Sequence, residues 1–392
     1  EPEPLIPAGY EIAYDQFQLP IQAEKRIYKA NGPALTTATS GDELTVSSSK
    51  VNFVFNKKSG LVTSYKVDGT EYFKDGFGIQ PNFWRAPNDN DYGNGAPKRL
   101  QVWKQSSKNF HVTDVKMTTE NKVVSLKATY LLAAGNLYVV TYRIYPSGIV
   151  NVSAQFTSTD MQAAETEVSE ATRMATFTPG SDAARKAASK LEVPRIGVRF
   201  RLPAQMNNVQ YFGRGPEENY IDRNHGTLVG VYKTTADKMY FNYVRPQENG
   251  HHTDTRWIAL SPDKGNGLAI VADSLIGFNA LRNSIEDFDS EEALPHPYQW
   301  NNFSPEEVAN HDEKAARNVL RRMHHVNDIT PRDFVEVCVD MKQQGVGGYD
   351  SWGARPEPFH QIPANRDYSW GFTLVPVRSA SQANEVAKYD YQ

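Results

Sequence analysis

The sequence predicts an all-β protein, most of which forms one large antiparallel sandwich. Three observations lead to this expectation. Apolar and polar residues alternate with a period of two in many short segments, turn residues separate these segments at hairpin spacing, and little helix lies between them. A parallel sheet would need helices between successive strands. We therefore expect antiparallel sheets packed face to face.

The predicted strands begin with a hairpin. Residues 50–55 (KVNFVF) alternate, residues 56–60 (NKKSG) form a turn, and residues 61–67 (LVTSYKV) run to a second turn at Asp68-Gly69. The same alternation predicts further strands over residues 122–131, 137–145, 149–156, 196–202, 268–272, 334–341 and 370–377.

One helix is predicted over residues 304–325. Ser304 is a good N-cap, Pro305 suits the first helical position, and Glu307 completes a capping box. Basic residues gather at the C-terminal end, where they complement the helix dipole.

The chain divides into four predicted segments. Residues 1–22 include a strand-like run at 12–19 with no earlier strand to pair with, so we expect the tail of a preceding domain. Residues 23–42 are small and polar toward their end, which is typical of a linker. Residues 43–378 form the large β domain. The polar residues 379–392 predict a loose tail.

The composition excludes several classes of protein. The 392 residues contain 42 basic and 46 acidic side chains, a net charge of −4, so no basic face is available for nucleic acid or an anionic membrane. No apolar run approaches the ~20 residues that span a bilayer. Because Cys338 is the only cysteine, no intrachain disulfide can form. The chain begins without Met or a signal-peptide segment, so we expect a mature form or a piece of a longer polypeptide.

Several carboxylates could form a glycosidase pair, which needs two carboxyl groups ~5–10 Å apart. The candidates are Glu217, Glu218, Asp222 and Glu248. Arginines at 214, 223 and 245 lie near them in the sequence, and this arrangement favours structural ion pairs over catalysis.

No metal site is predicted. Residues 88–95 (NDNDYGNG) resemble a calcium loop, but the twelfth position counted from Asp89 is Leu100 and not glutamate. This segment instead predicts a turn-rich loop in which Gly93 and Gly95 adopt positive φ. His251 and His252 are adjacent, so in a strand they would point to opposite faces.

Residues 345–352 (GVGGYDSW) are the most suggestive stretch. Three glycines beside an aromatic residue allow the backbone to approach another group closely. Trp352 on such a loop could stack on the apolar face of a sugar, or it could be a core residue. The sequence pattern favours neither alternative.

Five segments together carry a resemblance to a known family. They are residues 5–11 (LIPAGYE), 83–91 (FWRAPNDND), 211–223 (YFGRGPEENYIDR), 243–250 (YVRPQENG) and 345–352 (GVGGYDSW). In this order they resemble the C-terminal region, the small chain or domain 5, of the large bacterial β-galactosidases of glycoside hydrolase family 2, the lactose-operon type. The resemblance covers nearly the whole chain.

The resemblance implies a galactose-mutarotase-like β super-sandwich preceded by the last strand of an immunoglobulin-like domain. It also implies that the catalytic glutamates of a retaining hydrolase lie in an upstream TIM barrel. No barrel fits in this chain, because a barrel needs ~250 residues of alternating β and α and the chain offers sandwich strands instead. No residue here is then catalytic, and the fragment alone is expected to be inactive. Mg²⁺ or Na⁺ would bind through the barrel, so neither a cofactor nor a metal is expected in this chain.

The same resemblance implies the partners of the chain. These are a β-galactoside or other carbohydrate and the N-terminal domains of the same polypeptide. The parent enzyme is expected to be a bacterial homo-oligomer, in the cytoplasm or the periplasm.

The resemblance also assigns roles to individual residues. Trp352 matches an aromatic platform for the aglycone sugar, and Asp91, Gly93 and Gly95 match a loop that closes over the active site. The remaining motif residues are expected to be structural: Arg85, Asp89, Glu217, Glu218, Asp222, Arg223 and Glu248. The chain departs from the family at two places. Tyr349 replaces the family's Asp, which implies a changed aglycone preference, while loop 93–99 is short and contains Pro97, which argues against the closing motion.

Two other functions remain open. A mutarotase or epimerase on the same fold would need a general acid and base facing one sugar, for which His251, His252 and Glu248 are the candidates. A free-standing carbohydrate-binding module would bind sugar without any barrel.

Overall fold

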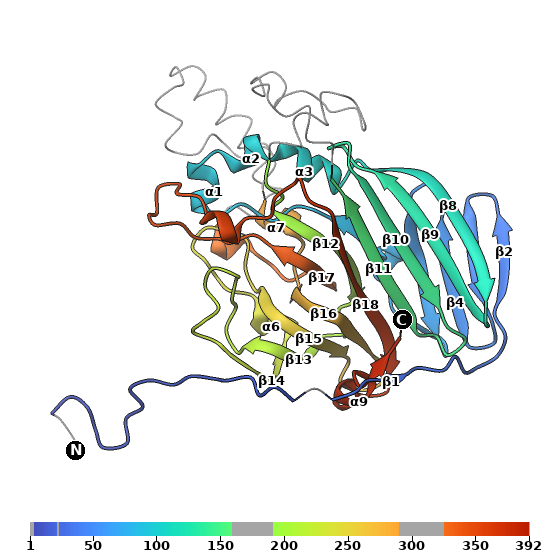
Figure 1. Ribbon diagram of the computed structural model, residues 1–392, viewed down its shortest axis with the longest axis horizontal. Helices are drawn as coiled ribbons and strands as arrows, with labels where there is room; N and C mark the ends of the chain where they lie inside the picture. The colour runs from blue at the N-terminus through green and yellow to red at the C-terminus, as the bar shows by residue number, and fades with distance from the viewer. Residues whose placement is uncertain (1–3, 22, 159–190, 290–324, 392) are drawn as a thin grey trace.

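The computed structural model describes residues 4–21, 23–158, 191–289 and 325–391. In these ranges strands are the main regular structure, and they form one large sheet, one five-stranded sheet and one two-stranded pair (Figure 1). Apart from the two-stranded pair, every ladder is antiparallel. The all-β, antiparallel prediction is therefore confirmed. Within the same ranges no helix is long and apolar enough to cross a membrane.

The five-stranded sheet is a simple meander in chain order. Its strands are β2 (Thr36–Ser40), β3 (Glu43–Ser47), β4 (Val51–Asn56), β5 (Leu61–Val67) and β6 (Thr70–Glu71). On β4 the alternation is visible as burial, because Val51, Phe53 and Phe55 are buried while the residues between them are partly exposed. One face of this sheet is thus apolar and needs a partner.

The large sheet has twelve strands, with the path β14-β13-β15-β16-β18-β11-β10-β9-β8 and with β12, β17 and β7 branching from it. The strands are β7 (Gln80–Asn82), β8 (His111–Glu120), β9 (Val123–Leu131), β10 (Leu137–Ile144), β11 (Val150–Thr157), β12 (Arg195–Pro203), β13 (Asn208–Gly215), β14 (Leu228–Thr235), β15 (His252–Ser261), β16 (Gly267–Leu281), β17 (Phe334–Gln343) and β18 (Tyr368–Val377). β16 makes the branch, because its first half pairs with β18 and its second half with β17.

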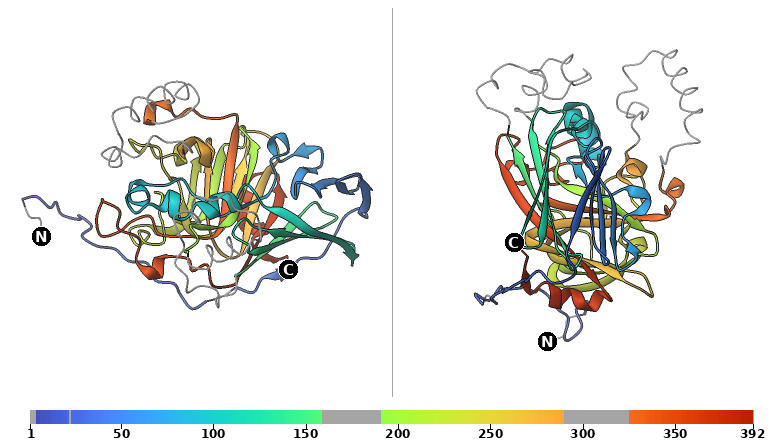
Figure 2. Two further views of the ribbon diagram at one scale, coloured as in Figure 1. Left: turned by 90° about the horizontal axis from the view of Figure 1, so that it is seen from above. Right: turned by 90° about the vertical axis from the view of Figure 1, so that its right-hand side faces the viewer.

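The five-stranded sheet lies beside the part of the large sheet that contains β8 to β10 (Figure 2). Buried aromatic residues join the two sheets into a sandwich. Phe53 on β4 contacts Tyr142 on β10, with ring centroids 5.7 Å apart. Two buried tyrosines also make hydrogen bonds across the interface. Tyr65 Oη donates to Gly148 O at 2.6 Å and Tyr130 Oη donates to Gly60 O at 2.7 Å. Each phenol therefore keeps its hydrogen bond when its ring is buried.

Each strand predicted by alternation between residues 50 and 377 is present, with bounds shifted by a residue or two or, for β16, a longer extent. The turn-rich loop predicted at 88–95 is wrong, because most of this range forms helix α1 (Asp89–Gly93). Two more short helices follow it, α2 (Ala96–Arg99) and α3 (Gln101–Ser106). The Asn88 side chain accepts from Asp91 N, and the Asp91 side chain accepts from Asn88 N, which makes a capping box. The predicted helix over 304–325 lies outside the described residues, except for its last residue.

Further short helices lie in the connections between strands. They are η1 (Lys74–Gly76), α6 (Ala236–Met239), α7 (Ile285–Phe288), η4 (Val326–Asp328) and η5 (Pro358–His360).

Two expectations about the N-terminal region are corrected. Residues 12–19 form no strand. They are exposed and contact the body through side chains, such as Gln16 Nε2 donating to Val229 O at 2.8 Å. The predicted linker 23–42 contains β1 (Arg26–Ile27) and the exposed edge strand β2. Pairing with β3 makes β2 a strand despite its polar composition.

The predicted loose C-terminal tail is also wrong. It contains η6 (Ala380–Gln382), α9 (Ala383–Val386) and β19 (Tyr389–Asp390), and β19 pairs with β1 in parallel. Tyr391 is buried against Tyr28, and its carbonyl oxygen accepts from Tyr145 Oη at 2.6 Å. Burial of aromatic side chains therefore fixes the C-terminal segment in place, although its overall composition is polar.

Candidate functional site

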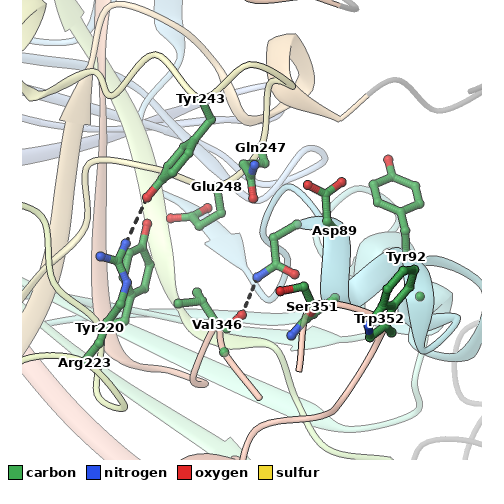
Figure 3. Close-up of a pocket in the computed structure, with 14 residues that line it drawn as sticks. Asp89, Tyr92, Tyr220, Arg223, Tyr243, Gln247, Glu248, Val346, Ser351 and Trp352 are labelled. Atoms are coloured by element: carbon green, nitrogen blue, oxygen red, sulfur yellow. Dashed lines mark hydrogen bonds between the residues drawn. The ribbon is translucent and has the colours of Figure 1, made fainter. Parts of the chain in front are cut away.

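A cavity of about 980 Å³ lies where four segments distant in the sequence meet (Figure 3). Its lining comes from residues 88–93, 220–223, 243–248 and 346–352. Each segment belongs to one of the motifs singled out from the sequence. Cavities that bind small molecules commonly have volumes of roughly 300–1,000 Å³, so this one is large enough for a sugar.

Trp352 lies on the edge of this cavity beside Tyr92 (Figure 3), and we call these two residues the aromatic rim. The Trp352 side chain is not part of the core, because the residue is 74% exposed. Asp350 Oδ1 accepts from the backbone N of Trp352 at 2.9 Å and of Ala354 at 3.0 Å, and these bonds lower the pKa of Asp350. They also shape the turn that presents the indole.

Helix α1 and the loop of Trp352 form one unit. Asn88 Nδ2 donates to Val346 O at 2.6 Å, and Asn90 Nδ2 donates to Asp350 O at 2.9 Å. A Cβ on Gly93 would lie 2.3 Å from Trp352 O, so only glycine allows the two backbones to approach this closely. Gly93 therefore serves close packing and not the positive φ predicted for it, whereas Gly95 has φ of 70°.

Asp91 does not point into the cavity. It is buried in an ion pair with Arg85, with Arg85 Nη2 3.0 Å from Asp91 Oδ1. Arg85 Nη1 also donates to Gln344 O at 2.7 Å. The pair thus ties α1 to the segment that precedes the Trp352 loop.

Asp89, another residue of α1, lines the cavity but is paired with an arginine. Arg245 Nη1 lies 2.5 Å from Asp89 Oδ1, and the guanidinium lies 3.8 Å from the centre of the Tyr92 ring. This cation–π contact holds Tyr92 in the aromatic rim.

The opposite side of the cavity is built around Glu218. Its Oε1 accepts from Arg223 Nη2 at 2.5 Å and from Tyr243 Oη, and its Oε2 accepts from Gly250 N at 2.6 Å. Asp222 Oδ2 accepts from Gly347 N at 2.8 Å, while Glu217 is exposed. The structure therefore uses Glu218 and Asp222 to join loops together.

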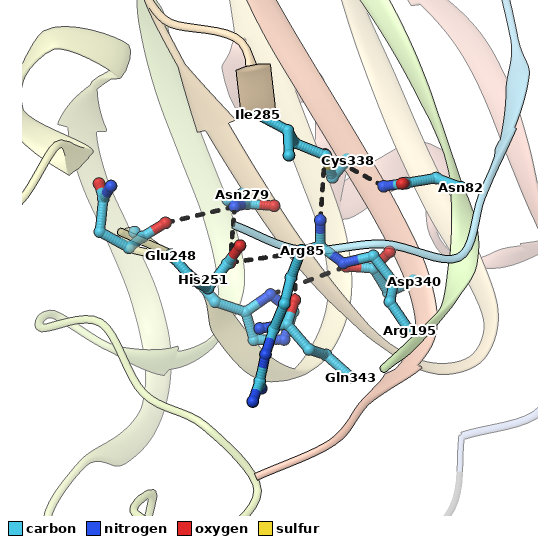
Figure 4. A network of polar contacts seen from close by, with 12 residues as sticks. Asn82, Arg85, Arg195, Glu248, His251, Asn279, Ile285, Cys338, Asp340 and Gln343 are labelled. Carbon is cyan, nitrogen blue, oxygen red and sulfur yellow. Dashed lines mark hydrogen bonds and ion pairs between the residues drawn. The ribbon is translucent and has the colours of Figure 1, made fainter. Parts of the chain in front are cut away.

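The deepest part of the cavity is formed by Tyr220 and Glu248, which we call the polar floor. Below it lies a buried charge cluster centred on Arg195 (Figure 4). Arg195 Nη2 is 3.1 Å from Glu248 Oε1, and Arg195 Nε is 3.3 Å from Asp340 Oδ2. His251 Nδ1 lies 3.7 Å from the same Asp340 oxygen.

Burial governs the protonation of this cluster. It raises the pKa of Asp340 to about 7 although Arg195 opposes the shift, and it also raises the pKa of Glu248. Burial and then Arg195 lower the pKa of His251 well below its usual range, so this imidazole is neutral at physiological pH.

Sequence reasoning missed Arg195 and Asp340. A signal was available, because each is a charged residue next to apolar residues of a strand, in RIGVRF on β12 and VCVDM on β17. Charged residues in fully buried strands are rare unless they are paired. The sequence alone did not indicate that the two strands are neighbours.

The residues proposed for an isomerase do not meet in the cavity. His251 and His252 are both buried, and of the three candidates only Glu248 lines the cavity. His252 is held by two carbonyl oxygens, with Nδ1 3.1 Å from Gly250 O and Nε2 3.2 Å from Pro216 O. In the described part of the chain, no three His, Cys, Asp or Glu side chains are arranged to hold a metal.

Comparison with known proteins gives consistent matches. The family model described as "Beta galactosidase small chain" matches residues 47–374. A beta-galactosidase of Priestia megaterium is 33% identical over 373 residues, which are 94% of this chain and 30% of that protein. A beta-galactosidase of Streptococcus thermophilus is 25% identical over 377 residues, 95% of this chain and 30% of that protein. The chain thus spans about 30% of the length of these relatives.

Among solved structures, a galactose mutarotase related enzyme from Lactobacillus acidophilus is 8% identical. The match has a TM-score of 0.40 and covers 86% of this chain and 98% of the Lactobacillus acidophilus chain. A score this low carries no inference about the chemistry of this chain.

Proposed function

Because the chain belongs to the beta-galactosidase small-chain family, we propose that it forms one wall of the galactoside site of a retaining, lactose-operon-type β-galactosidase of glycoside hydrolase family 2. The catalytic glutamates would lie in another part of a longer polypeptide. The observation that carries this proposal is the cavity. It has an exposed aromatic rim, and both carboxylates that line it are paired with arginines.

The carboxylates of the cavity support a binding role. Asp89 and Glu248 are the two that line it, and each is paired with an arginine, Arg245 and Arg195 respectively. A retaining mechanism needs one carboxylate free to attack the anomeric carbon and one acid free to protonate the leaving group. For the same reason the Mg²⁺ or Na⁺ expected of the parent enzyme does not fit this wall, because a cation would have to displace these arginines.

The aromatic rim supplies the binding contact. The flat face of an indole or phenol can pack on the C–H groups of a pyranose, and such contacts contribute roughly 0.5–1.5 kcal/mol beyond the area that they bury. Trp352 and Tyr92 would therefore position the aglycone sugar while the barrel performs the reaction.

The division of labour between the two parts can be tested with the chain alone. We expect the purified chain to hydrolyse nitrophenyl galactoside no faster than buffer and to leave the mutarotation of α-galactose unchanged in a polarimeter. The full-length polypeptide should hydrolyse the same substrate. Enzyme-like turnover of either sugar by the chain alone would show that the proposal is wrong.

The role of Trp352 can be tested in the full-length enzyme. Trp352→Ala should raise the KM for lactose about tenfold, since ~1.4 kcal/mol of lost binding corresponds to a factor of ten. Turnover of nitrophenyl galactoside should change much less. Phe359→Ala is the control, because Phe359 is an aromatic residue that is 71% exposed but does not line the cavity. Equal losses on the two substrates would contradict the platform role.

A further inference from the structure

The polar floor contains a buried hydroxyl group without a partner. Tyr220 is 2% exposed, yet its Oη has no hydrogen-bond partner in the described part of the chain. A buried polar atom left unpaired costs free energy, typically ~1–3 kcal/mol. Because Tyr220 also lines the cavity, a ligand that fills the cavity could satisfy this hydroxyl.

The surrounding side chains hold the Tyr220 ring in place. The His251 imidazole is stacked on it, with centroids 5.4 Å apart and planes at 25°, and the Arg223 guanidinium lies 4.9 Å from the ring centre. Arg223 is itself fixed by Glu218. The hydroxyl is therefore preorganised, and a ligand would not have to order it.

Glu248 provides the complementary group. Its carboxylate points toward Tyr220 in Figure 3. Burial, and then the charges of Glu218 and Glu248, raise the pKa of the Tyr220 phenol. Arg195 and Asn279 Nδ2 hold Glu248 Oε1 at 3.1 and 3.2 Å. The floor thus offers one phenolic donor beside one fixed carboxylate acceptor.

From this geometry we propose that the polar floor binds a hydroxyl group of the aglycone sugar, which accepts from Tyr220 Oη and donates to Glu248. A sugar hydroxyl is a donor and an acceptor at once, so it satisfies both groups. An aryl aglycone has no such hydroxyl and leaves Tyr220 unpaired. Tyr220 is then a specificity-determining residue, in addition to the aromatic rim, and this inference rests on the proposed function.

Tyr220→Phe tests the proposal, because it removes only the hydroxyl. In the full-length enzyme we expect kcat/KM for lactose to fall about 3- to 10-fold, the effect of one lost hydrogen bond to a ligand. For nitrophenyl galactoside the change should stay below about twofold. The midpoint of urea unfolding should stay the same or rise, since no hydrogen bond of the free protein is lost.

Tyr240→Phe is the matched control. Tyr240 Oη is likewise buried and without a partner in the described ranges, but it lies outside the cavity, so this variant should treat both substrates like the parent. Unchanged or equally reduced kcat/KM for both substrates in Tyr220→Phe would overturn the inference. If Trp352→Ala still discriminates the substrates in that case, the proposed function stands and only the role of the polar floor fails.

Discussion

Arg195→Met is expected to lower the free energy of unfolding by about 3–5 kcal/mol, the usual cost of removing one partner from a buried ion pair. Arg195 is fully buried and is the cation nearest to both Glu248 and Asp340, at 3.1 and 3.3 Å. Methionine fills a similar volume but supplies no charge and no donor. Urea unfolding at pH 8, followed by intrinsic fluorescence, measures the loss.

Arg26→Met is the control for this variant. Arg26 is paired with Glu385 at 3.9 Å, but both side chains are more than half exposed. Exposed pairs contribute ~0–1 kcal/mol, so this change should be small. A similarly small loss for Arg195→Met would contradict the view that the buried charges depend on this arginine.

The second large effect concerns pH. Burial raises the pKa of Asp340 from 3.8 to about 7, against the opposing effect of Arg195. Between these two values the folded protein keeps a proton that the unfolded chain has released, so stability is full below about pH 4 and declines as pH rises toward 7. At ~1.4 kcal/mol per pKa unit, the decline from this group is on the order of 4 kcal/mol.

Asp340→Asn should remove most of this decline, because the amide keeps the shape of the protonated acid and does not titrate. Free energies of unfolding measured from pH 4.5 to 8 should therefore fall less steeply in the variant than in the parent. Identical slopes would show that Asp340 does not carry the pH dependence.

Glu286→Gln is the control for the pH experiment. Burial would raise the pKa of Glu286, but Arg199 outweighs this and lowers it to about 2. A depressed pKa contributes stability that is lost only as pH falls below about 4. The slope between pH 5 and 8 should therefore match that of the parent.

These charges also bear on the candidate site. Glu248 reaches the cavity from one side of the cluster, and Asp340 lies behind it beside His251. The position of the proposed hydroxyl acceptor thus depends on a network that is itself buried in the sheet (Figure 4). A variant that disturbs Arg195 is expected to weaken the polar floor as well as the fold.

Local patterns predicted much of the fold because the side-chain period is a local property. Strands β4 and β5 could be predicted from alternation, since every second residue faces the core. Helices α1 to α3 could not be predicted in this way, because each of them is short. The capping signal at the start of α1 spans only Asn88 to Asp91. The polar tail misled the prediction since Tyr391 is buried by contacts with residues far away in the chain.

The all-β class, the positions of nine strands, the candidate role of Trp352 and the family resemblance follow from the residues alone, because periodicity and motifs are properties of short stretches of the chain. The folded structure was needed to show that four motif segments line one cavity, that α1 is bonded to the Trp352 loop, and that Arg195 lies between Glu248 and Asp340. These features depend on which strands and loops become neighbours. That is set by the packing of the whole molecule, and no local pattern of residues encodes it.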